Sequence, residues 1–248
     1  MSNNVILITG ALSGIGRATA LAAAHEKYRI VVSGRNSKTG KALESELRAL
    51  GAEVQFIRTD VRSESEVQAL IEGTVARFGR IDVAVNNAGT EGTPAPIVDQ
   101  TLEAFAATFE TNVLGVLLCM KHEPRVMQAQ GSGSIVNISS TMGSRGAANA
   151  SLYVASKHAV EGLTKSGALE AAQFGVRVNA VAPGPVETDM LDRFTGSEER
   201  KAGLLASIPL HRAGRLEELA DAILFLASDK ATFVTGQIIN VNGGRTAS

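Results

Sequence analysis

The sequence predicts an α/β fold, in which a doubly wound parallel sheet of about seven strands carries helices on both faces. Two observations predict it. Short runs rich in β-branched and apolar residues recur along the chain, and the stretches between them carry the period of a helix. Strands that are apolar throughout, instead of alternating with polar residues, are typical of a sheet that is buried on both faces.

The predicted strands are spread over the whole chain. They are residues 5–9, 29–33, 53–57, 81–85, 134–138, 176–181 and 237–241. No linker of low complexity and no repeat of fixed period interrupts this alternation. Residues 1–248 are therefore expected to form a single domain.

Among the predicted helices, residues 63–78 show the clearest pattern. Their apolar residues recur at helical spacing, and Ser63 with Glu66 has the sequence of a capping box at the start. An Ala-rich helix is expected at residues 17–26, directly after the first strand, and an Ala/Gly-rich helix at residues 151–174. Residues 102–127 are apolar over much of a helix circumference. Such a helix is either central in the monomer or buried against a partner subunit, unless one side packs on the sheet and the rest is poorly patterned.

Composition excludes several classes of protein. Lys plus Arg is 24 and Asp plus Glu is 25, so the formal charge is −1, with no basic excess for nucleic acid or an anionic membrane. No apolar run reaches the ~18 residues of a membrane span. The single cysteine, Cys119, excludes an internal disulfide framework and a Cys-rich zinc site, and the four histidines form no metal-ligand pattern. The N-terminus does not resemble a signal peptide, so a cytoplasmic location is expected.

The first chemical signal is a glycine turn directly after the first strand. Gly10, Gly14 and Gly16 let the strand turn sharply, and the helix that follows points its positive end at the turn. A pyrophosphate fits there. The spacing differs from the usual Gly-x-Gly-x-x-Gly fingerprint, and alone it is equally compatible with a tight turn; the flanking strand and helix supply the context for nucleotide binding.

Further markers follow in order along the chain. They are Thr9-Gly10-x-x-x-Gly14-x-Gly16, Asn86-Asn87-Ala88-Gly89, Asn112, Ser140, Tyr153-x-x-x-Lys157 and Pro183-Gly184. With these markers the sequence, from about Val5 to Gly244, resembles the classical short-chain dehydrogenases/reductases. The resemblance implies a Rossmann-type fold and a nicotinamide cofactor.

Tyr153 and Lys157 are four residues apart on a predicted helix, so both side chains project from one face. A free phenol has a pKa of about 10, which must fall by roughly three units for work near neutrality. A nearby ammonium and the positive charge of an oxidised nicotinamide have the right sign to lower it. Tyr153 would then exchange a proton with the ketone or alcohol oxygen while hydride moves to or from the nicotinamide. Ser140 would hold the same oxygen by a hydrogen bond.

The resemblance assigns the remaining roles. Asn112 is expected to order a water that links Lys157 to solvent. Ser139 competes with Ser140, and the family's thirteen-residue gap before the tyrosine selects Ser140. The residues expected to bind the cofactor are Gly10, Ser13, Gly14, Ile15, Gly16, Arg35, Asn36, Asp60, Val61, Asn87, Ala88, Gly89, Tyr153, Lys157, Pro183, Gly184, Val186 and Thr188.

Cofactor choice is decided at the end of the second strand, where an NAD enzyme places an acidic residue. Here Gly34 stands at that position and Arg35 follows it. A guanidinium can pair with the 2′-phosphate of NADP(H), with Asn36 and Lys38 in support. We therefore expect a moderate preference for NADP(H). The alternative is that Arg35 is a solvated loop cation and selectivity is relaxed.

The substrate is less well defined. A lid is expected at about residues 185–210, where Met190, Leu191 and Phe194 either form an apolar ceiling or pack the lid down. Arg145 or Glu91 either gives polar selectivity or is a solvated loop residue.

The function expected is NADP(H)-dependent reduction of a ketone, or oxidation of a secondary alcohol. The enzyme alternatives are a 3-oxoacyl thioester reductase and a sugar 1-dehydrogenase, and the non-enzyme alternative is an NADP(H)-binding regulator. The only partners expected are a small-molecule substrate and other subunits. A monomer would expose a large apolar patch over residues 113–120 and 151–174, and relatives usually pair through these helices and the C-terminal strand, so a homotetramer is expected.

Overall fold

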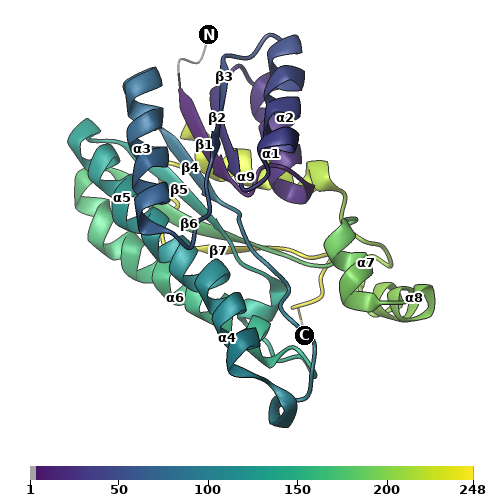
Figure 1. The fold of residues 1–248 in the computed structure, drawn as a ribbon. Coiled ribbons are helices and arrows are strands. Elements are labelled where there is room, and N and C mark those ends of the chain that lie inside the picture. Colours follow the sequence, from purple (N-terminus) through teal and green to yellow (C-terminus); the bar gives the residue numbers. More distant parts are fainter. Residues whose placement is uncertain (1–3, 248) are drawn as a thin grey trace.

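The computed structural model describes residues 4–247 and confirms the predicted α/β fold, a Rossmann-type sheet between two layers of helices (Figure 1). Seven parallel strands lie in the order β3-β2-β1-β4-β5-β6-β7. Their bounds are β1 Val5–Thr9, β2 Arg29–Gly34, β3 Val54–Arg58, β4 Val83–Asn86, β5 Gly133–Ile138, β6 Val176–Pro183 and β7 Ile238–Val241. Each predicted strand is present, with its ends shifted by two residues at most.

The helices divide between the two faces of the sheet. Their bounds are α1 Gly14–His25, α2 Ser37–Ala49, α3 Glu64–Phe78, α4 Leu102–Phe109, α5 Gly115–Gln130, α6 Ser151–Ala171, α7 Asp189–Thr195, α8 Glu198–Ala206 and α9 Leu216–Ala227. Apolar residues of α1, α2 and α9 pack on one face, with Ile6 and Ile8 of β1. Those of α3, α5 and α6 pack on the other, with Val5 and Leu7. Successive strand residues point to opposite faces, which is why these strands are apolar throughout.

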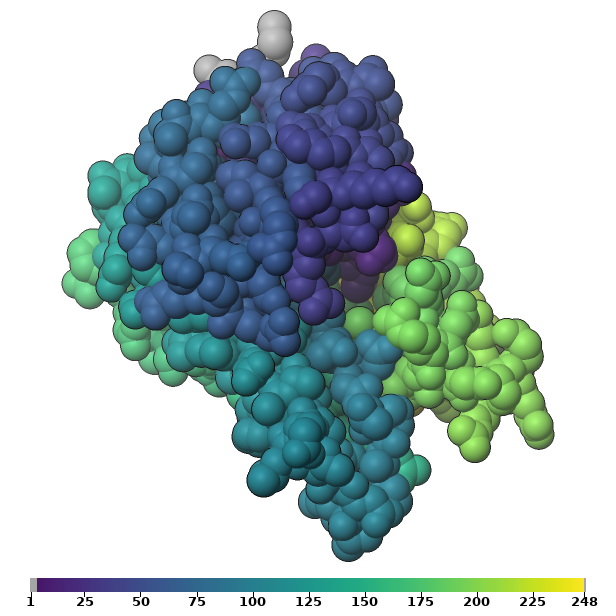
Figure 2. Space-filling model, in the orientation of Figure 1, coloured from purple at the N-terminus to yellow at the C-terminus, as the bar shows by residue number. Residues whose placement is uncertain are grey.

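The sheet reverses its winding at β1, which pairs with β2 on one side and β4 on the other. In an open parallel sheet, the carboxyl ends of the strands on either side of such a point form the ligand crevice. In Figure 2 a recess lies between the purple N-terminal residues and the light green α7–α8 segment.

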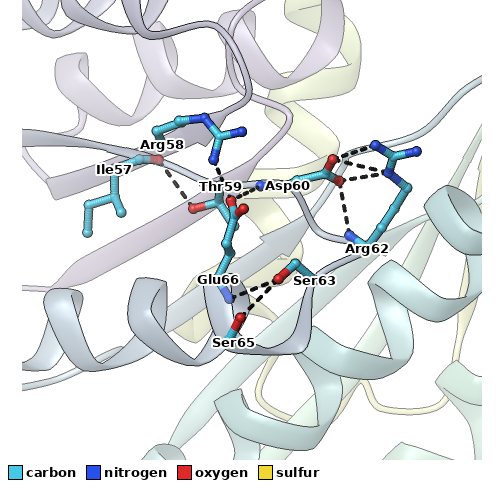
Figure 3. Close-up of polar contacts among 8 residues, drawn as sticks. All are labelled: Ile57, Arg58, Thr59, Asp60, Arg62, Ser63, Ser65 and Glu66. Atoms are coloured by element: carbon cyan, nitrogen blue, oxygen red, sulfur yellow. Dashed lines mark hydrogen bonds and ion pairs between the residues drawn. The ribbon is translucent and has the colours of Figure 1, made fainter.

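The start of α3 differs from the predicted capping box (Figure 3). Ser63 caps the helix as expected, since its Oγ accepts from the Glu66 N–H at 3.4 Å. The Glu66 carboxylate, however, does not return to Ser63. It accepts from the backbone N–H of Asp60 and from Arg58, both at 2.8 Å. A charged guanidinium forms a stronger hydrogen bond with the Glu66 carboxylate than the backbone N–H of Ser63 would. Glu66 therefore connects α3 to the loop that follows β3.

Helix α4, a π turn at Glu110–Leu114 and α5 form one continuous helix of 29 residues. An 18-residue window of this helix has a mean hydropathy of 1.4, so by length and composition the helix could span a membrane. Polar residues interrupt it, so it contains no unbroken apolar run of that length. One side packs on α3, α6 and the sheet. In the single chain this helix therefore covers the sheet with one side and exposes Leu102, Phe105, Leu114 and Leu117 on the other, where a partner subunit would bury them.

Candidate active site

A cavity of about 660 Å³ opens at the carboxyl ends of the central strands, beneath α7 and α8. Most of the predicted site residues line it. Gly16 and Asn112 do not, and both lie behind its wall. The topology thus brings together residues that are up to 178 positions apart, from Gly10 to Thr188.

The glycine turn has the geometry that its sequence requires. Gly10 and Gly14 have φ angles of +61° and +52°, in the region that favours glycine. A Cβ on Gly10 would lie 2.7 Å from the Ala88 Cα, and one on Gly16 would collide with the Asn87 amide. Asn87 Nδ2 in turn donates to the Gly10 carbonyl at 2.9 Å. Glycine is therefore needed for close packing as well as for the turn.

Helix α1 begins at Gly14 with Ser13 as its N-cap residue, and the Ser13 side chain makes no capping hydrogen bond. The first N–H groups of the helix therefore stay available at the cavity wall, together with the positive end of the helix dipole. A dinucleotide pyrophosphate fits this cradle.

Tyr153 and Lys157 lie on one face of α6, as predicted. Lys157 Nζ is 5.5 Å from the centroid of the Tyr153 ring and donates to the Ile138 carbonyl at 2.9 Å. Ser140 follows the end of β5 by two residues and lines the cavity, and its Oγ accepts from the Met142 N–H at 3.2 Å. All three side chains reach the same cavity.

Burial governs the charge state of this pair. It raises the pKa of Tyr153 to about 12, with a hydrogen bond from Ser140 opposing the rise and the Glu91 carboxylate adding to it. Burial also lowers the pKa of Lys157 to about 8. The direction for Tyr153 is opposite to the one the sequence argument requires, because desolvation of the phenolate is the largest effect on its pKa. In this state Tyr153 is a neutral phenol, which is the form that donates a proton.

Asn112 lies in the π turn and is fully buried. Its Oδ1 accepts from the Thr90 N–H at 2.8 Å, and its Nδ2 donates to Ser156 Oγ at 3.0 Å. A Cβ on Gly89 would lie 3.3 Å from Asn112 Oδ1 and 3.6 Å from Lys157 Nζ. A side chain at position 89 would therefore contact both Asn112 and Lys157.

The two neighbouring serines have different surroundings. Ser139 is buried and donates to Glu161 Oε1 at 2.8 Å, so its hydroxyl is committed to α6. Ser140 is half-buried and faces Tyr153. The geometry favours Ser140, which the sequence also selected.

At the other end of the cavity, Arg35 lines the wall and makes no hydrogen bond or ion pair within residues 4–247. Its guanidinium is therefore available to a ligand. Asn36 also lines the wall, but its side chain caps α2 by accepting from the Thr39 N–H at 3.0 Å. Lys38 is exposed on α2 outside the cavity lining, so the support expected from it is absent. Asp60 is held by Arg62 at 2.6 Å (Figure 3).

The predicted lid forms α7 and α8. Leu191 is buried, whereas Met190 and Phe194 are half-buried, and all three line the cavity. The burial of Leu191 fits a residue that packs this segment down, and the position of its two neighbours fits an apolar ceiling. Thr188 caps α7, and its methyl group would contact a Cβ on Gly14 at 3.5 Å. The lid thus starts directly over the glycine turn.

Some residues of the cavity were missed by sequence reasoning. Glu91, for which the sequence left open a role in polar selectivity or a solvated loop position, has a largely buried side chain, and its ion pair with Arg193 of α7 at 2.5 Å was not predicted. Arg245 from the C-terminal segment also lines the wall. No local signal identifies these contacts, because each joins segments about 100 residues apart. Within residues 4–247, no group of three His, Cys, Asp or Glu side chains is placed to hold a metal.

Comparison with known proteins settles the family. The family model described as Enoyl-(Acyl carrier protein) reductase, which belongs to the short-chain dehydrogenases, matches residues 10–246. This chain is a classical short-chain dehydrogenase/reductase. It is 43% identical over 246 residues to a cis-4-hydroxycyclohexanecarboxylate dehydrogenase from Sinomonas cyclohexanicum, covering 99% of this chain and 98% of the relative. It is 42% identical over 239 residues to a 3-oxoacyl-(acyl-carrier-protein) reductase from Staphylococcus aureus, covering 96% of each.

Solved structures of the family have the same fold. Levodione reductase superposes with a TM-score of 0.97 at 35% identity, over 100% of this chain and 99% of that one. NAD+-bound xylitol dehydrogenase gives 0.94 at 34% identity, over 98% and 99%. A variant of actinorhodin polyketide ketoreductase with NADPH gives 0.94 at 38% identity, over 99% and 98%. The chain is therefore an oxidoreductase of this family.

Proposed function

We propose that this enzyme reduces a ketone to a secondary alcohol, or catalyses the reverse reaction, with NADP(H). The observation that carries the proposal is that Tyr153, Ser140 and Lys157 reach one cavity, whose opposite wall is the glycine turn. When bound, NADP(H) supplies or accepts the hydride.

The side chains divide the remaining work. Ser140 donates a hydrogen bond to the substrate oxygen, and Tyr153 gives that oxygen its proton in the reduction. Lys157 places a positive charge beside the phenol and favours the phenolate that remains. Asn112 bonds to the Thr90 backbone and to the Ser156 hydroxyl on α6, next to Lys157, and, as in the family, orders the water that returns the proton.

NADP(H) is proposed over NAD(H) because Arg35, next to Gly34, lines the cavity and forms no ion pair or hydrogen bond with any of residues 4–247. Relatives are divided, since one of the similar structures holds NADPH and another NAD+. The test is kcat/KM for both cofactors in the native enzyme, in Arg35→Ala and in a Lys38→Ala control outside the cavity. We expect a native preference for NADPH that Arg35→Ala alone removes. A preference for NADH, or unchanged selectivity in Arg35→Ala, would contradict the assignment.

A cyclic ketone is the substrate class favoured by the apolar ceiling and by the relative named as a cis-4-hydroxycyclohexanecarboxylate dehydrogenase. The second candidate is a 3-oxoacyl thioester, favoured by the 42% identity to the Staphylococcus aureus enzyme. A panel of cyclic ketones, acetoacetyl thioesters and sugars, followed by NADPH loss, discriminates between them. Turnover of none, with NADPH still bound, would favour the binding regulator.

We also propose that the enzyme is a cytoplasmic homotetramer. Leu102 and Leu169 are 82% and 84% exposed, and Phe233 is fully exposed beside the edge strand β7. Leu169, on α6, lies within the residues where the sequence predicted subunit contacts, whereas Leu102, on α4, and Phe233, five residues before β7, lie outside them. Cys119 is buried and free, which suits a reducing compartment.

A further inference from the structure

Two arginines meet at the lid side of the cavity, away from Arg35. Arg145 donates from Nη1 to the backbone carbonyl of Arg245 at 3.1 Å. Arg245 lines the cavity, and its own Nη1 lies 3.5 Å from Ser207 Oγ, just past the end of α8. Arg145 follows Ser140 by five residues, so the loop that supports Arg245 also carries a proposed catalytic group.

The charge of Arg245 is not compensated within the described chain. It is half-buried, and no carboxylate among residues 4–247 forms an ion pair with it. Burial and the nearby charge of Arg145 both lower its pKa. By contrast Arg193, the other arginine on this side, is neutralised by Glu91. Glu187 and Asp189 also border the cavity, and both are exposed and make no bond to Arg245.

A partly desolvated cation beside a like charge is unfavourable unless an anion joins it. A guanidinium offers two parallel N–H donors that match the two oxygens of a carboxylate. Apolar side chains of the lid line the same cavity as Arg245 and Ser140, and they suit the carbon skeleton of a ligand that reaches both.

We propose that Arg245, braced by Arg145, binds a carboxylate of the substrate, so that the natural substrate is an oxo acid or hydroxy acid. The carboxylate then lies at the end of the molecule opposite the reacting carbon. This inference names the substrate class of the proposed reductase and in that respect rests on the proposed function. The anion site itself can be tested without turnover.

The binding test compares cyclohexanecarboxylate with the uncharged cyclohexanecarboxamide by calorimetric titration into the full-length protein. Wild type is expected to bind the carboxylate about ten-fold or more tightly than the amide. Arg245→Met keeps an unbranched apolar stem and the backbone carbonyl that Arg145 needs but removes the guanidinium, and it should remove this difference. Arg145→Met should reduce it. Arg200→Met, an exposed lid residue outside the cavity, removes the same charge and should leave the difference intact.

The kinetic test uses 4-oxocyclohexanecarboxylate and its methyl ester with NADPH. The acid should have the higher kcat/KM through a lower KM, and Arg245→Met should make the two ketones equal while retaining turnover of the ester. Equal binding of carboxylate and amide by wild type, or an Arg245→Met protein that still discriminates, overturns the anion site. If the wild-type enzyme reduces the ester as efficiently as the acid, the anion site is overturned. The reductase assignment then still stands. Binding that depends on Arg245 without reduction of either ketone supports the site and counts against the reductase.

Discussion

The side chain of Leu12 occupies the space that a Cβ at Gly34 would need. A carbon built there lies 2.7 Å from both Cγ and Cδ1 of Leu12. Gly34 is the last residue of β2, where NAD enzymes of this fold carry an acidic residue. Leu12 comes from the glycine turn, so two segments that line the proposed cofactor site also restrict each other. The lack of an acid at position 34 is therefore a matter of packing as well as of charge.

We predict that Gly34→Asp alone lowers Tm and gives a poor enzyme with either cofactor, because the new side chain must displace Leu12. Adding Leu12→Ala should restore Tm and shift selectivity towards NADH by about ten-fold or more, since the carboxylate repels a 2′-phosphate. Thermal melts and kcat/KM with both cofactors measure this. A single variant with the native Tm would show that Leu12 yields easily.

Tyr153→Phe should abolish turnover and leave NADP(H) affinity within a few-fold, because only the proton-donating hydroxyl is lost. Steady-state rates and a fluorescence titration with NADPH measure the two effects. Tyr28→Phe, at the chain's other tyrosine in the core, is the matched control and should stay active. If Tyr153→Phe keeps more than about a tenth of the wild-type rate, the activation barrier has risen by less than about 1.4 kcal/mol. That result would rule out Tyr153 as the proton donor.

Lys157→Met should reduce kcat severely and also weaken cofactor binding, which would separate it from Tyr153→Phe. The physical reason is that Lys157 Nζ is anchored at the Ile138 carbonyl, where its charge reaches both the Tyr153 ring and the cavity. Titration with NADPH gives the binding effect, and single-turnover rates give the chemical one. A variant that binds NADPH as the native enzyme does would confine Lys157 to the proton transfer.

Glu123 predicts a pH dependence of stability. It is fully buried on α5, its Oε2 accepts from Asn86 Nδ2 at 3.0 Å, and its Oε1 has no partner within the described chain. Burial raises its pKa to about 7. Between the ordinary pKa of 4.5 and this value the folded state holds a proton that the unfolded state has released. The free energy of unfolding therefore falls as pH rises through this window, by up to about 1.4 kcal/mol per pH unit.

Glu123→Gln should remove this contribution and make the protein more stable than wild type above pH 7. Urea unfolding at intervals from pH 5 to 8 measures it, because the buried amide carries no charge at any of these values. Glu72→Gln, on the exposed side of α3, is the control and should follow the wild-type profile. Parallel profiles for Glu123→Gln and wild type would show that Glu123 is ionised in the fold.

Light scattering at micromolar concentration should report a tetramer, because exposed apolar side chains lie on two separate faces of the chain. Replacing Phe233 and Leu169 by Ser should yield smaller species without loss of the fold by circular dichroism. A stable native species of about 26 kDa, as expected for the 25.8 kDa chain alone, would refute the assembly.

The sequence by itself determined the fold, the family and the main residues of the site. Apolar runs with β-branched residues fix where strands lie, since a strand buried on both faces tolerates few other residues. The glycine turn and the Tyr153–Lys157 spacing carry local geometry, so both could be predicted from residues only a few positions apart. Arg35 was found in the same way, from its place after Gly34.

Tertiary structure alone decided the interactions that join distant segments. The Glu91–Arg193 pair, the Arg145–Arg245 contact and the Leu12–Gly34 packing each form only when the sheet and the lid have folded. It also decided the charge states, because the pKa of Tyr153 depends on how much solvent the surrounding chain removes. Local spacing predicts which residues share a face, whereas burial and long-range contacts depend on the whole packed molecule.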